Sequence, residues 1–266
     1  IVSISTVSGA DATESGTQSE TITIIADGDA APTVTLATSA TSITENAGSS
    51  LTLTATLSNA TNEDVTVALS TSGTGTEGTD YSTISDITIS AGDSTGTVSF
   101  TPTDDSVYEG NETGIVAISN VSGGSATENG NQSVTITISE NESAPTVTLT
   151  SSASSIAENA GSSLTLTATL SVATTADVTV TIGTSGTGTE GTDYTDGSGN
   201  IDDIVISAGA TTGTASFTPT DDSIYEGNET SIVAIDTVSG GSATEDGTQS
   251  VTITITENES SPTVTL

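Results

Sequence analysis

Apolar and polar residues alternate along short stretches of this chain. Residues 51–57 (LTLTATL) show a period of two, because one threonine separates each apolar residue from the next: Leu51, Leu53, Ala55 and Leu57. The same period occurs in three further stretches of the first half, at 65–67, 98–100 and 134–138. A period of two places apolar side chains on one face of a β-strand and threonine on the other. No stretch has a helical period, so the pattern predicts an all-β fold.

Long segments of the chain occur twice. Residues 47–58 (AGSSLTLTATLS) recur unchanged at 160–171, and residues 71–81 (TSGTGTEGTDY) recur at 184–194. Repeated segments that come later in each copy are separated by four more residues than the earlier ones. The second copy carries a Gly-, Asn- and Asp-rich insertion at 195–203 (TDGSGNIDD), which we interpret as a longer loop. Each copy has about seven alternating stretches separated by turn residues. The sequence therefore predicts tandem Ig-like antiparallel β-sandwiches with about seven strands per unit.

The repeats also predict the domain organisation. The first residues of the chain resemble the end of the first complete copy, and PTVTL at its end resembles the start of both copies. We interpret the chain as four segments: the C-terminal strands of a preceding repeat at 1–31, two complete units at 32–144 and 145–261, and the first strand of a following repeat at 262–266.

The charge of the chain excludes many functions. Its 266 residues include 35 Asp and Glu but no Lys, Arg or His, so the formal net charge is -35. Lysine Schiff bases, arginine clamps, Ser-His-Asp triads and histidine metal ligands are therefore excluded. Nucleic acids and anionic membrane surfaces are excluded as partners because both require basic side chains. The chain also has no Cys, which excludes disulfides and zinc thiolate sites.

An enzymatic function is not expected. An acid pair such as Asp104 or Asp105 with Glu109 is the minimum of a glycosidase. Such a site also needs aromatic side chains that stack on sugar rings, and only 2% of the residues are aromatic. No apolar run reaches 18 residues, so we also expect no transmembrane helix.

The most informative residues are acids that recur at the same place in both copies, in the turns between the predicted strands. They are Glu45, Asp80, Asp104, Asp105, Glu109, Glu112, Glu140 and Glu142 in the first unit, and Glu158, Asp193, Asp221, Asp222, Glu226, Glu229, Glu257 and Glu259 in the second. If loops at one end of a sandwich bring such carboxylates together, each close pair repels by about 1 to 4 kcal/mol. The chain has no cationic side chain to offset this repulsion. A cation from solution is then required, and a set of oxygen ligands of this kind favours Ca²⁺ over Mg²⁺.

Four segments resemble the Calx-β domain, a module of sodium-calcium exchanger regulatory regions, integrin β4 and many bacterial surface proteins. They are ENAGS, GTDY, the acidic pair followed by ExxE, and a closing strand that ends in an acidic linker. The resemblance covers both units and implies that the sixteen acids above are the Ca²⁺ ligands. Where the family often has consecutive aspartates in the linker, this chain has Glu140, Asn141 and Glu142, which leaves the number of ions per site open.

Other acidic and aromatic residues have simpler interpretations. We expect nine further acids to be solvated turn residues: Glu63, Asp64, Glu77, Asp86, Asp93, Glu128, Asp177, Glu190 and Glu245. Tyr81 and Tyr108, with their repeat partners Tyr194 and Tyr225, are expected to be packing residues.

The favoured hypothesis is a calcium-binding structural module that forms a rigid extracellular stalk or filament of a surface adhesin or matrix protein. Near-identical tandem units and acids at the junction between them favour it, and each unit would contact its neighbours along the array. Chains could also associate laterally into fibres. Two alternatives remain: a calcium-sensing regulatory module, and repeats that themselves bind glycans or proteins in adhesion.

Overall fold

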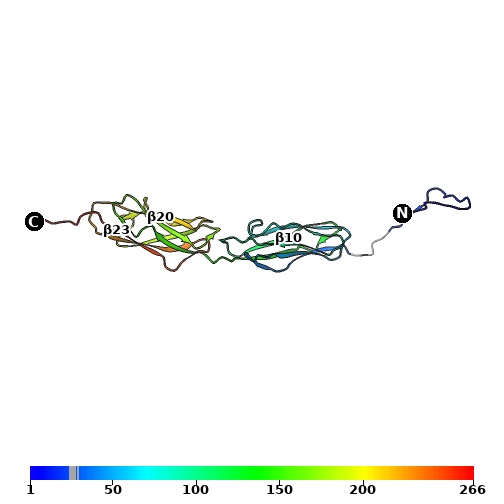
Figure 1. Cartoon of the computed structure of the whole chain (residues 1–266), viewed down its shortest axis with the longest axis horizontal. Helices are drawn as coiled ribbons and strands as arrows, with labels where there is room; N and C mark the ends of the chain where they lie inside the picture. The colour runs from blue at the N-terminus through cyan, green and yellow to red at the C-terminus, as the bar shows by residue number, and fades with distance from the viewer. Residues whose placement is uncertain (24–27, 29) are drawn as a thin grey trace.

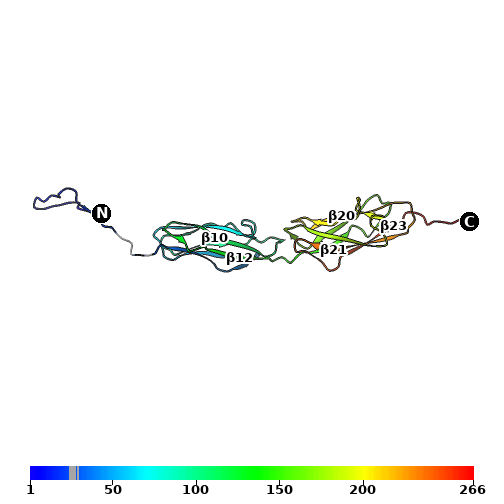
Figure 2. The ribbon, with the colours of Figure 1, turned by 180° about the vertical axis from the view of Figure 1, so that it is seen from behind.

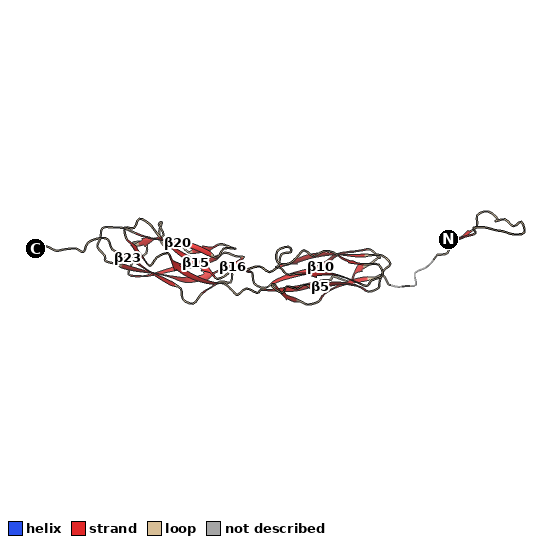
Figure 3. Ribbon diagram, in the orientation of Figure 1, coloured by secondary structure: helices blue, strands red, loops and turns tan. Residues whose placement is uncertain are grey.

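The computed structural model describes residues 1–23, 28 and 30–266 of the chain. Two β-sandwiches lie end to end, preceded by a small N-terminal hairpin (Figures 1 and 2). The hairpin pairs β1 (Val2–Ser3) with β2 (Ser19–Glu20). Every regular element in the described residues is a strand (Figure 3). The described residues contain no helix long and apolar enough to span a membrane. The prediction of an all-β fold is confirmed.

The first sandwich, unit one, consists of two facing sheets. One sheet has the order β4-β12-β10-β6-β7 and the other β11-β3-β5-β8. The strands are β3 (Thr33–Thr38), β4 (Ser42–Thr44), β5 (Leu51–Leu57), β6 (Val65–Gly73), β7 (Ile87–Ile89), β8 (Thr95–Phe100), β10 (Glu112–Ser122), β11 (Thr127–Glu128) and β12 (Ser133–Ser139).

The second sandwich, unit two, repeats this arrangement. Its sheets have the orders β14-β23-β21-β17-β19 and β18-β20-β15-β13-β22. The strands are β13 (Thr146–Ser151), β14 (Ser155–Ala157), β15 (Leu164–Leu170), β17 (Val178–Gly186), β18 (Tyr194–Thr195), β19 (Ile204–Ile206), β20 (Thr212–Pro219), β21 (Glu229–Ser239), β22 (Thr244–Glu245) and β23 (Ser250–Thr256).

The period of two produces the core of each unit. In β5, Leu53 and Ala55 are fully buried while the intervening threonine lies on the outer face. Tyr81 stacks on Phe100 in the same core, with ring centroids 4.6 Å apart and ring planes inclined by 23°. Because aliphatic side chains fill almost all of the remaining core, this pair supplies most of its aromatic packing.

The strand count differs from the expected seven. Unit one has nine strands in its two sheets, because β4 and β11 add to the sheet edges. These two strands have only three and two residues, which is too short for a recognisable alternation. They also pair in parallel with β12 and β3, whereas we expected only antiparallel neighbours.

The tyrosines divide into two groups. Tyr81 and Tyr194 are each 1% exposed, which confirms their packing role. Tyr108 is half-buried, but Tyr225 is 43% exposed, so the prediction that it packs is wrong. The reason is that Tyr108 has the second unit beside it, while no described residue covers Tyr225 in the same way.

The structure also bears on the loops and chain ends. Thr195, the first residue of the insertion at 195–203, ends β18, and the rest of the insertion forms no strand before β19, as expected for a longer loop. Residues 262–266 carry no strand either, so their assignment to a following repeat stays a prediction.

A short parallel pair connects the two units. β9 (Val107–Tyr108) of unit one lies beside β16 (Ala173–Thr174) of unit two, with Val107 opposite Ala173 and Tyr108 opposite Thr174. β16 lies at the junction between the sandwiches (Figure 3).

Candidate metal centre

Each unit gathers six of its eight predicted acids into two groups of three carboxylates. In every group, one ligand oxygen from each residue lies within 4.8 Å of the others. We name the groups by their first member: the Glu45 trio (Glu45, Glu140, Glu142), the Asp80 trio (Asp80, Glu109, Glu112), the Glu158 trio (Glu158, Glu257, Glu259) and the Asp193 trio (Asp193, Glu226, Glu229).

The Glu45 trio is assembled by the parallel pairing of β4 with β12. Thr44, the last residue of β4, lies opposite Ser139, the last residue of β12. Because parallel strands run in the same direction, the residues that follow them, Glu45 and Glu140, leave the sheet edge together. The backbone N–H of Glu45 donates to the carbonyl of Ser139 at 3.0 Å, which holds this alignment.

The Asp80 trio is assembled around the start of β10. Glu112 opens this strand, so the expectation that all recurring acids lie in turns is wrong for Glu112 and for its equivalent Glu229. Asp80 lies in the turn after β6, and its carboxylate accepts a hydrogen bond from the N–H of Thr76 at 2.5 Å.

A glycine allows the Asp80 turn to approach β10. Gly73 has a φ of 120°, and a Cβ placed on it would lie 2.1 Å from the carbonyl oxygen of Thr113. Any side chain at this position would therefore force β6 away from the residue that follows Glu112. Gly186 has the same conformation in unit two.

Glu140 is the centre of a hydrogen-bond network between the linker and the loop before β10. Its Oε2 accepts from the backbone N–H groups of Glu109 and Gly110, both at 2.7 Å. Its Oε1 accepts from the N–H groups of Asn141 and Glu142, both at 3.0 Å. One carboxylate thus receives four donors without any cationic side chain.

The trios have strongly perturbed ionisation. Burial, followed by the charges of Glu140 and Glu142, raises the pKa of Glu45 to about 7. Burial and the neighbouring Asp80 raise the pKa of Glu112 to about 7, and the same causes act on Glu229 beside Asp193. These groups hold protons more strongly because their ionised forms are close to one another and partly removed from water.

Glu140 and its equivalent Glu257 have lowered pKa values instead. Burial acts against ionisation of Glu140, but the backbone N–H groups around it keep its pKa below the ordinary value. Its equivalent Glu257 accepts backbone hydrogen bonds from Glu259, Glu226 and Gly227, which lower its pKa to about 2. Each unit therefore keeps at least one permanent anion at the candidate site near neutral pH.

The donor set and its unsatisfied atoms fit a calcium ion. Oε2 of Glu142 is buried and has no hydrogen-bond partner, and the same is true of Oε2 of Glu259. A buried carboxylate oxygen without a partner is costly, so it indicates a missing positive group. Because every ligand atom in the trios is a carboxylate oxygen, a hard cation is the appropriate group.

The predicted aspartate pairs are not members of the trios. Asp104 and Asp105, with Asp221 and Asp222 in unit two, remain exposed. Asp105 is nevertheless close enough for its charge to raise the pKa of Glu45 and of Glu109. Its carboxylate also accepts a hydrogen bond from the N–H of Val107 at 2.7 Å. The prediction that all eight acids of a unit are ligands stays a prediction.

Sequence reasoning missed several supporting residues. Asn111 accepts a hydrogen bond from the N–H of Glu140 at 3.0 Å, and Asn228 does the same for Glu257. Both lie in the recurring YEGNET segment, so their repetition was a usable signal. Glu77 was expected to be solvated, but its carboxylate accepts from the Oγ1 of Thr71 at 2.6 Å and from a backbone N–H in the turn that carries Asp80.

The same correction applies to other acids that we expected to be only solvated. Six more of them accept hydrogen bonds. Glu128, Glu190 and Glu245 accept from residues four to six positions away and close local turns. Asp64, Asp86 and Asp177 accept from the backbone N–H of residues that are distant in the sequence, Ala91, Leu69 and Ala208. None of these acids belongs to a trio.

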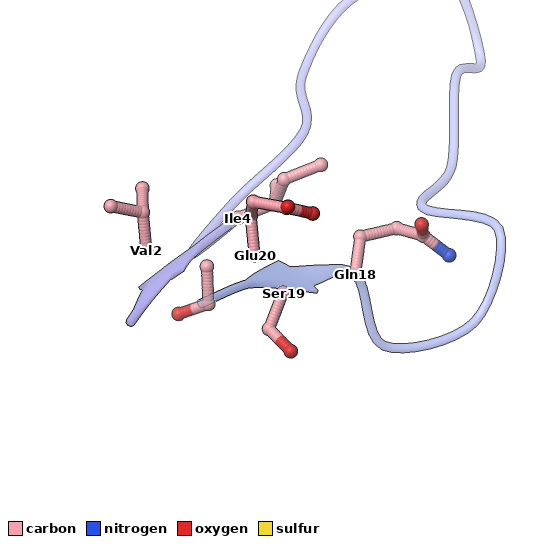
Figure 4. Close-up of a pocket in the computed structure, with 6 residues that line it drawn as sticks. Val2, Ile4, Gln18, Ser19 and Glu20 are labelled. Atoms are coloured by element: carbon pink, nitrogen blue, oxygen red, sulfur yellow. The ribbon is translucent and has the colours of Figure 1, made fainter. Parts of the chain in front are cut away.

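Surface hollows lie away from the trios, and the lining of two of them includes acidic residues. One, of about 250 Å³, lies in the N-terminal hairpin and is lined by Val2, Ile4, Gln18, Ser19 and Glu20 among others (Figure 4). Glu20 is its only carboxylate, which is insufficient for a metal centre. The other lies beside Asp196, Asp202 and Asp203 of the insertion loop, where the charge of Asp196 raises the pKa of Asp202.

The fold and the paired carboxylate trios define a class of protein: tandem β-sandwich modules with acidic, calcium-type sites at one end. The Calx-beta domain model matches residues 27–142 and again residues 140–259. The chain therefore belongs to the Calx-beta family, whose domains are calcium-binding β-sandwich modules.

Solved structures that match this chain include calcium-binding domains of CALX proteins and bacterial adhesins. "CBD12 from CALX1.2" is 17% identical, with 80% of this chain and 96% of that chain covered and a TM-score of 0.37. The adhesin InvE of Yersinia pseudotuberculosis is 13% identical, with 84% and 58% covered and a TM-score of 0.36. Invasin, a bacterial integrin-binding protein, is 18% identical, with 85% and 40% covered and a TM-score of 0.38. A comparison with curated proteins finds no match.

Proposed function

We propose that this chain is a calcium-stiffened structural module of an extracellular stalk or filament, such as the shaft of a surface adhesin or matrix protein. The observation that carries the proposal is the buried, unpartnered Oε2 of Glu142 in the linker between the units. A cation bound there would join the linker to Glu45 at the end of β4 and to Glu140 at the end of β12. The bound ion would offset the negative charge and would be coordinated by oxygens of both the linker and unit one. Because the linker would then be tied to unit one, its range of orientations would be restricted.

The similarity of the two units supports a structural role over the calcium-sensing alternative. The Glu45 and Glu158 trios each contain three glutamates, and the Asp80 and Asp193 trios each contain one aspartate and two glutamates. Identical ligand sets favour similar affinities, whereas a graded sensor benefits from sites of different affinity. Binding of glycans or proteins by the units, and lateral assembly of chains into fibres, remain proposals of the same kind.

The proposal is tested by melting and small-angle X-ray scattering of the full chain in millimolar Ca²⁺ and in EGTA. A ligand at 100 times its dissociation constant stabilises the folded state by about 2.7 kcal/mol per site. Two sites per unit should therefore raise the Tm by roughly 10 to 20 °C. The maximum dimension in scattering should also become longer and better defined in Ca²⁺.

Magnesium at the same concentration is the control for ionic strength and general charge screening. Because Mg²⁺ demands a near-octahedral shell and retains its waters, it should produce much less than the Ca²⁺ shift. Identical melting and scattering in Ca²⁺ and EGTA would contradict the proposal. Half-saturation near 1 μM, with two clearly different affinities, would instead favour a sensor.

A further inference from the structure

The two units present one segment in two different environments. In unit one, Val107 and Tyr108 form β9, are half-buried, and pair with unit two. Their repeat equivalents in unit two, Ile224 and Tyr225, form no strand and are 60% and 43% exposed. The sequence of the segment is nearly the same, so the neighbouring unit accounts for the difference.

The opposite edge of each unit shows the matching difference. In unit two, Thr174 of β16 is only 1% exposed, and Ala173 is half-buried. The equivalent residues of unit one, Ala60 and Thr61, form no strand; Ala60 is exposed and Thr61 is half-buried. The chain therefore has one formed junction, between β9 and β16. The equivalents of these two strands, Ala60 and Thr61 in unit one and Ile224 and Tyr225 in unit two, have no strand partner among the described residues.

The free Ile224 edge is held by the same hydrogen bonds as the paired one. In unit one the N–H of Val107 donates to Asp105 at 2.7 Å, and in unit two the N–H of Ile224 donates to Asp222 at 2.6 Å. On the other side of the segment, the N–H of Glu226 donates to Glu257 at 2.6 Å, as Glu109 does to Glu140 in unit one. Pairing with a partner would require little further ordering, which reduces its entropic cost.

The free Thr61 edge is preformed as well. The carbonyl of Thr61 accepts from the N–H of Gly92 at 2.7 Å, and the carbonyl of Thr174 accepts from Gly209 at 2.8 Å. The Oγ1 of Thr61 donates to the carbonyl of Glu63 at 2.6 Å, and Thr174 has the equivalent bond. The conformation of this edge is thus the same with and without a neighbouring unit.

We infer that Ile224 and Tyr225 are a docking strand for a further copy of this sequence that follows them in the same chain, and that this copy presents Ala60 and Thr61 as the receiving edge. The contact is head-to-tail, because each copy uses a different edge, and such a contact extends into a linear array rather than closing on itself. The inference rests on the proposed function only for its role in a stalk. Asp222 and Glu257, which hold the Ile224 segment, are also candidate ligands, so the docking is measured both in Ca²⁺ and in EGTA.

A pair of two-residue strands is too small to hold separate molecules together strongly. In the formed junction the two edges belong to one chain, so they meet at a high effective concentration. The test therefore uses a fused chain in which residue 261 of one copy is followed directly by residue 32 of a second. Because Pro32, Pro145 and Pro262 occupy the same place in the repeat, this joint keeps the spacing of the natural junction.

Hydrogen exchange followed by mass spectrometry measures the docking directly. The first copy carries Ile224→Val, which makes its segment resemble Val107 and gives its peptides a distinct mass. In the unfused chain, the amide of Tyr108 should exchange at least about ten times more slowly than that of Tyr225, whereas the flanking amides are hydrogen-bonded in both units. In the fused chain, the amide of Tyr225 in the first copy should slow to the rate of Tyr108.

The second copy of the fused chain is the matched control, because its Ile224 and Tyr225 have no unit behind them and should remain fast. Equal exchange of the Tyr225 amide in both copies would overturn the inference. Equal exchange of the Tyr108 and Tyr225 amides in the unfused chain would also overturn it, since the formed junction would then be absent in solution. Calcium binding is measured separately by calorimetry, so a failure of the proposed calcium site is recognised independently of the exchange result.

Discussion

Glu140 accepts a hydrogen bond from the backbone N–H of Glu109 at 2.7 Å, although both residues carry carboxylates of the candidate calcium site. Glu257 and Glu226 have the same relationship at 2.6 Å in unit two. A carboxylate that is stabilised by backbone donors can remain ionised among other anions. Glu140 therefore has a structural role that does not depend on a bound ion, whereas we propose that Glu45 and Glu142 act through a bound cation.

Replacing Glu140 should destabilise unit one even without calcium. Glu140→Ala leaves four backbone N–H groups without their acceptor, and we expect a loss of about 1 to 3 kcal/mol in the free energy of unfolding. Urea denaturation in EGTA measures this loss. Glu142→Ala is the matched control, because Oε2 of Glu142 has no partner and its removal should cost little in EGTA. Equal effects of the two substitutions would contradict the assigned role of Glu140.

Replacing Glu45 should have opposite effects with and without calcium. Glu45 is 7% exposed and repelled by Glu140 and Glu142, so Glu45→Gln should raise the stability of the calcium-free protein by about 1 kcal/mol or more. In saturating Ca²⁺ the same variant should be less stable than the unmodified chain, because it has lost a charged ligand. Thermal melting in both conditions tests this reversal. Glu63→Gln, at an exposed position, should change neither value, and a shift of the same sign in both conditions would refute the ligand role of Glu45.

The calcium-free protein should become more stable as the pH falls from about 7 toward 4.5. The pKa values of Glu45, Glu112 and Glu229 are raised to about 7 in the folded state, from an ordinary value of 4.5. In this window the folded state binds more protons than the unfolded state, so the free energy of unfolding decreases as the pH rises. The Tm in EGTA should therefore be higher at pH 5.5 than at pH 8.

Calcium should remove this advantage of low pH, because protons and Ca²⁺ compete for the same carboxylates. The Tm in millimolar Ca²⁺ should be no higher at pH 5.5 than at pH 8. A calcium-free Tm that falls steadily between pH 8 and 5.5 would show that the carboxylates are not clustered in solution as they are in the structure.

A single buried hydroxyl distinguishes the two cores. Ser231 is fully buried and its Oγ has no partner, whereas unit one has Gly114 at the same place. Ser231→Ala should stabilise unit two by about 1 kcal/mol, because it removes an unsatisfied polar group without opening a large cavity. The reverse change, Gly114→Ser, should destabilise unit one, since a Cβ there would lie 2.8 Å from the ring of Phe100.

Calorimetry of the full chain resolves this prediction if the two units melt separately. If they melt together, the two substitutions should still shift the single transition in opposite directions. Destabilisation by Ser231→Ala would indicate that Oγ of Ser231 has a partner in solution, contrary to the structure.

Much of the fold could be predicted from the alternation of residues. Leu53 and Ala55 lie in the core as their spacing indicates, and the two units are β-sandwiches as the repeated alternation indicates. Short edge strands such as β4 could not be predicted, because three residues are too few for a period to be recognised. The role of Glu77 was also hidden, since its hydrogen-bond partners are decided by the path of a turn.

The sequence by itself determined the class of fold and the sign of the ions that the chain attracts, since a period of two and a charge of -35 are properties of order and composition. Only the tertiary structure decided which carboxylates meet. Glu45 and Glu140 are far apart along the chain and become neighbours because β4 and β12 end at the same level in parallel. The structure likewise decided that Tyr108 is covered and Tyr225 is not, because burial depends on which unit lies next to a strand as well as on the residues within it.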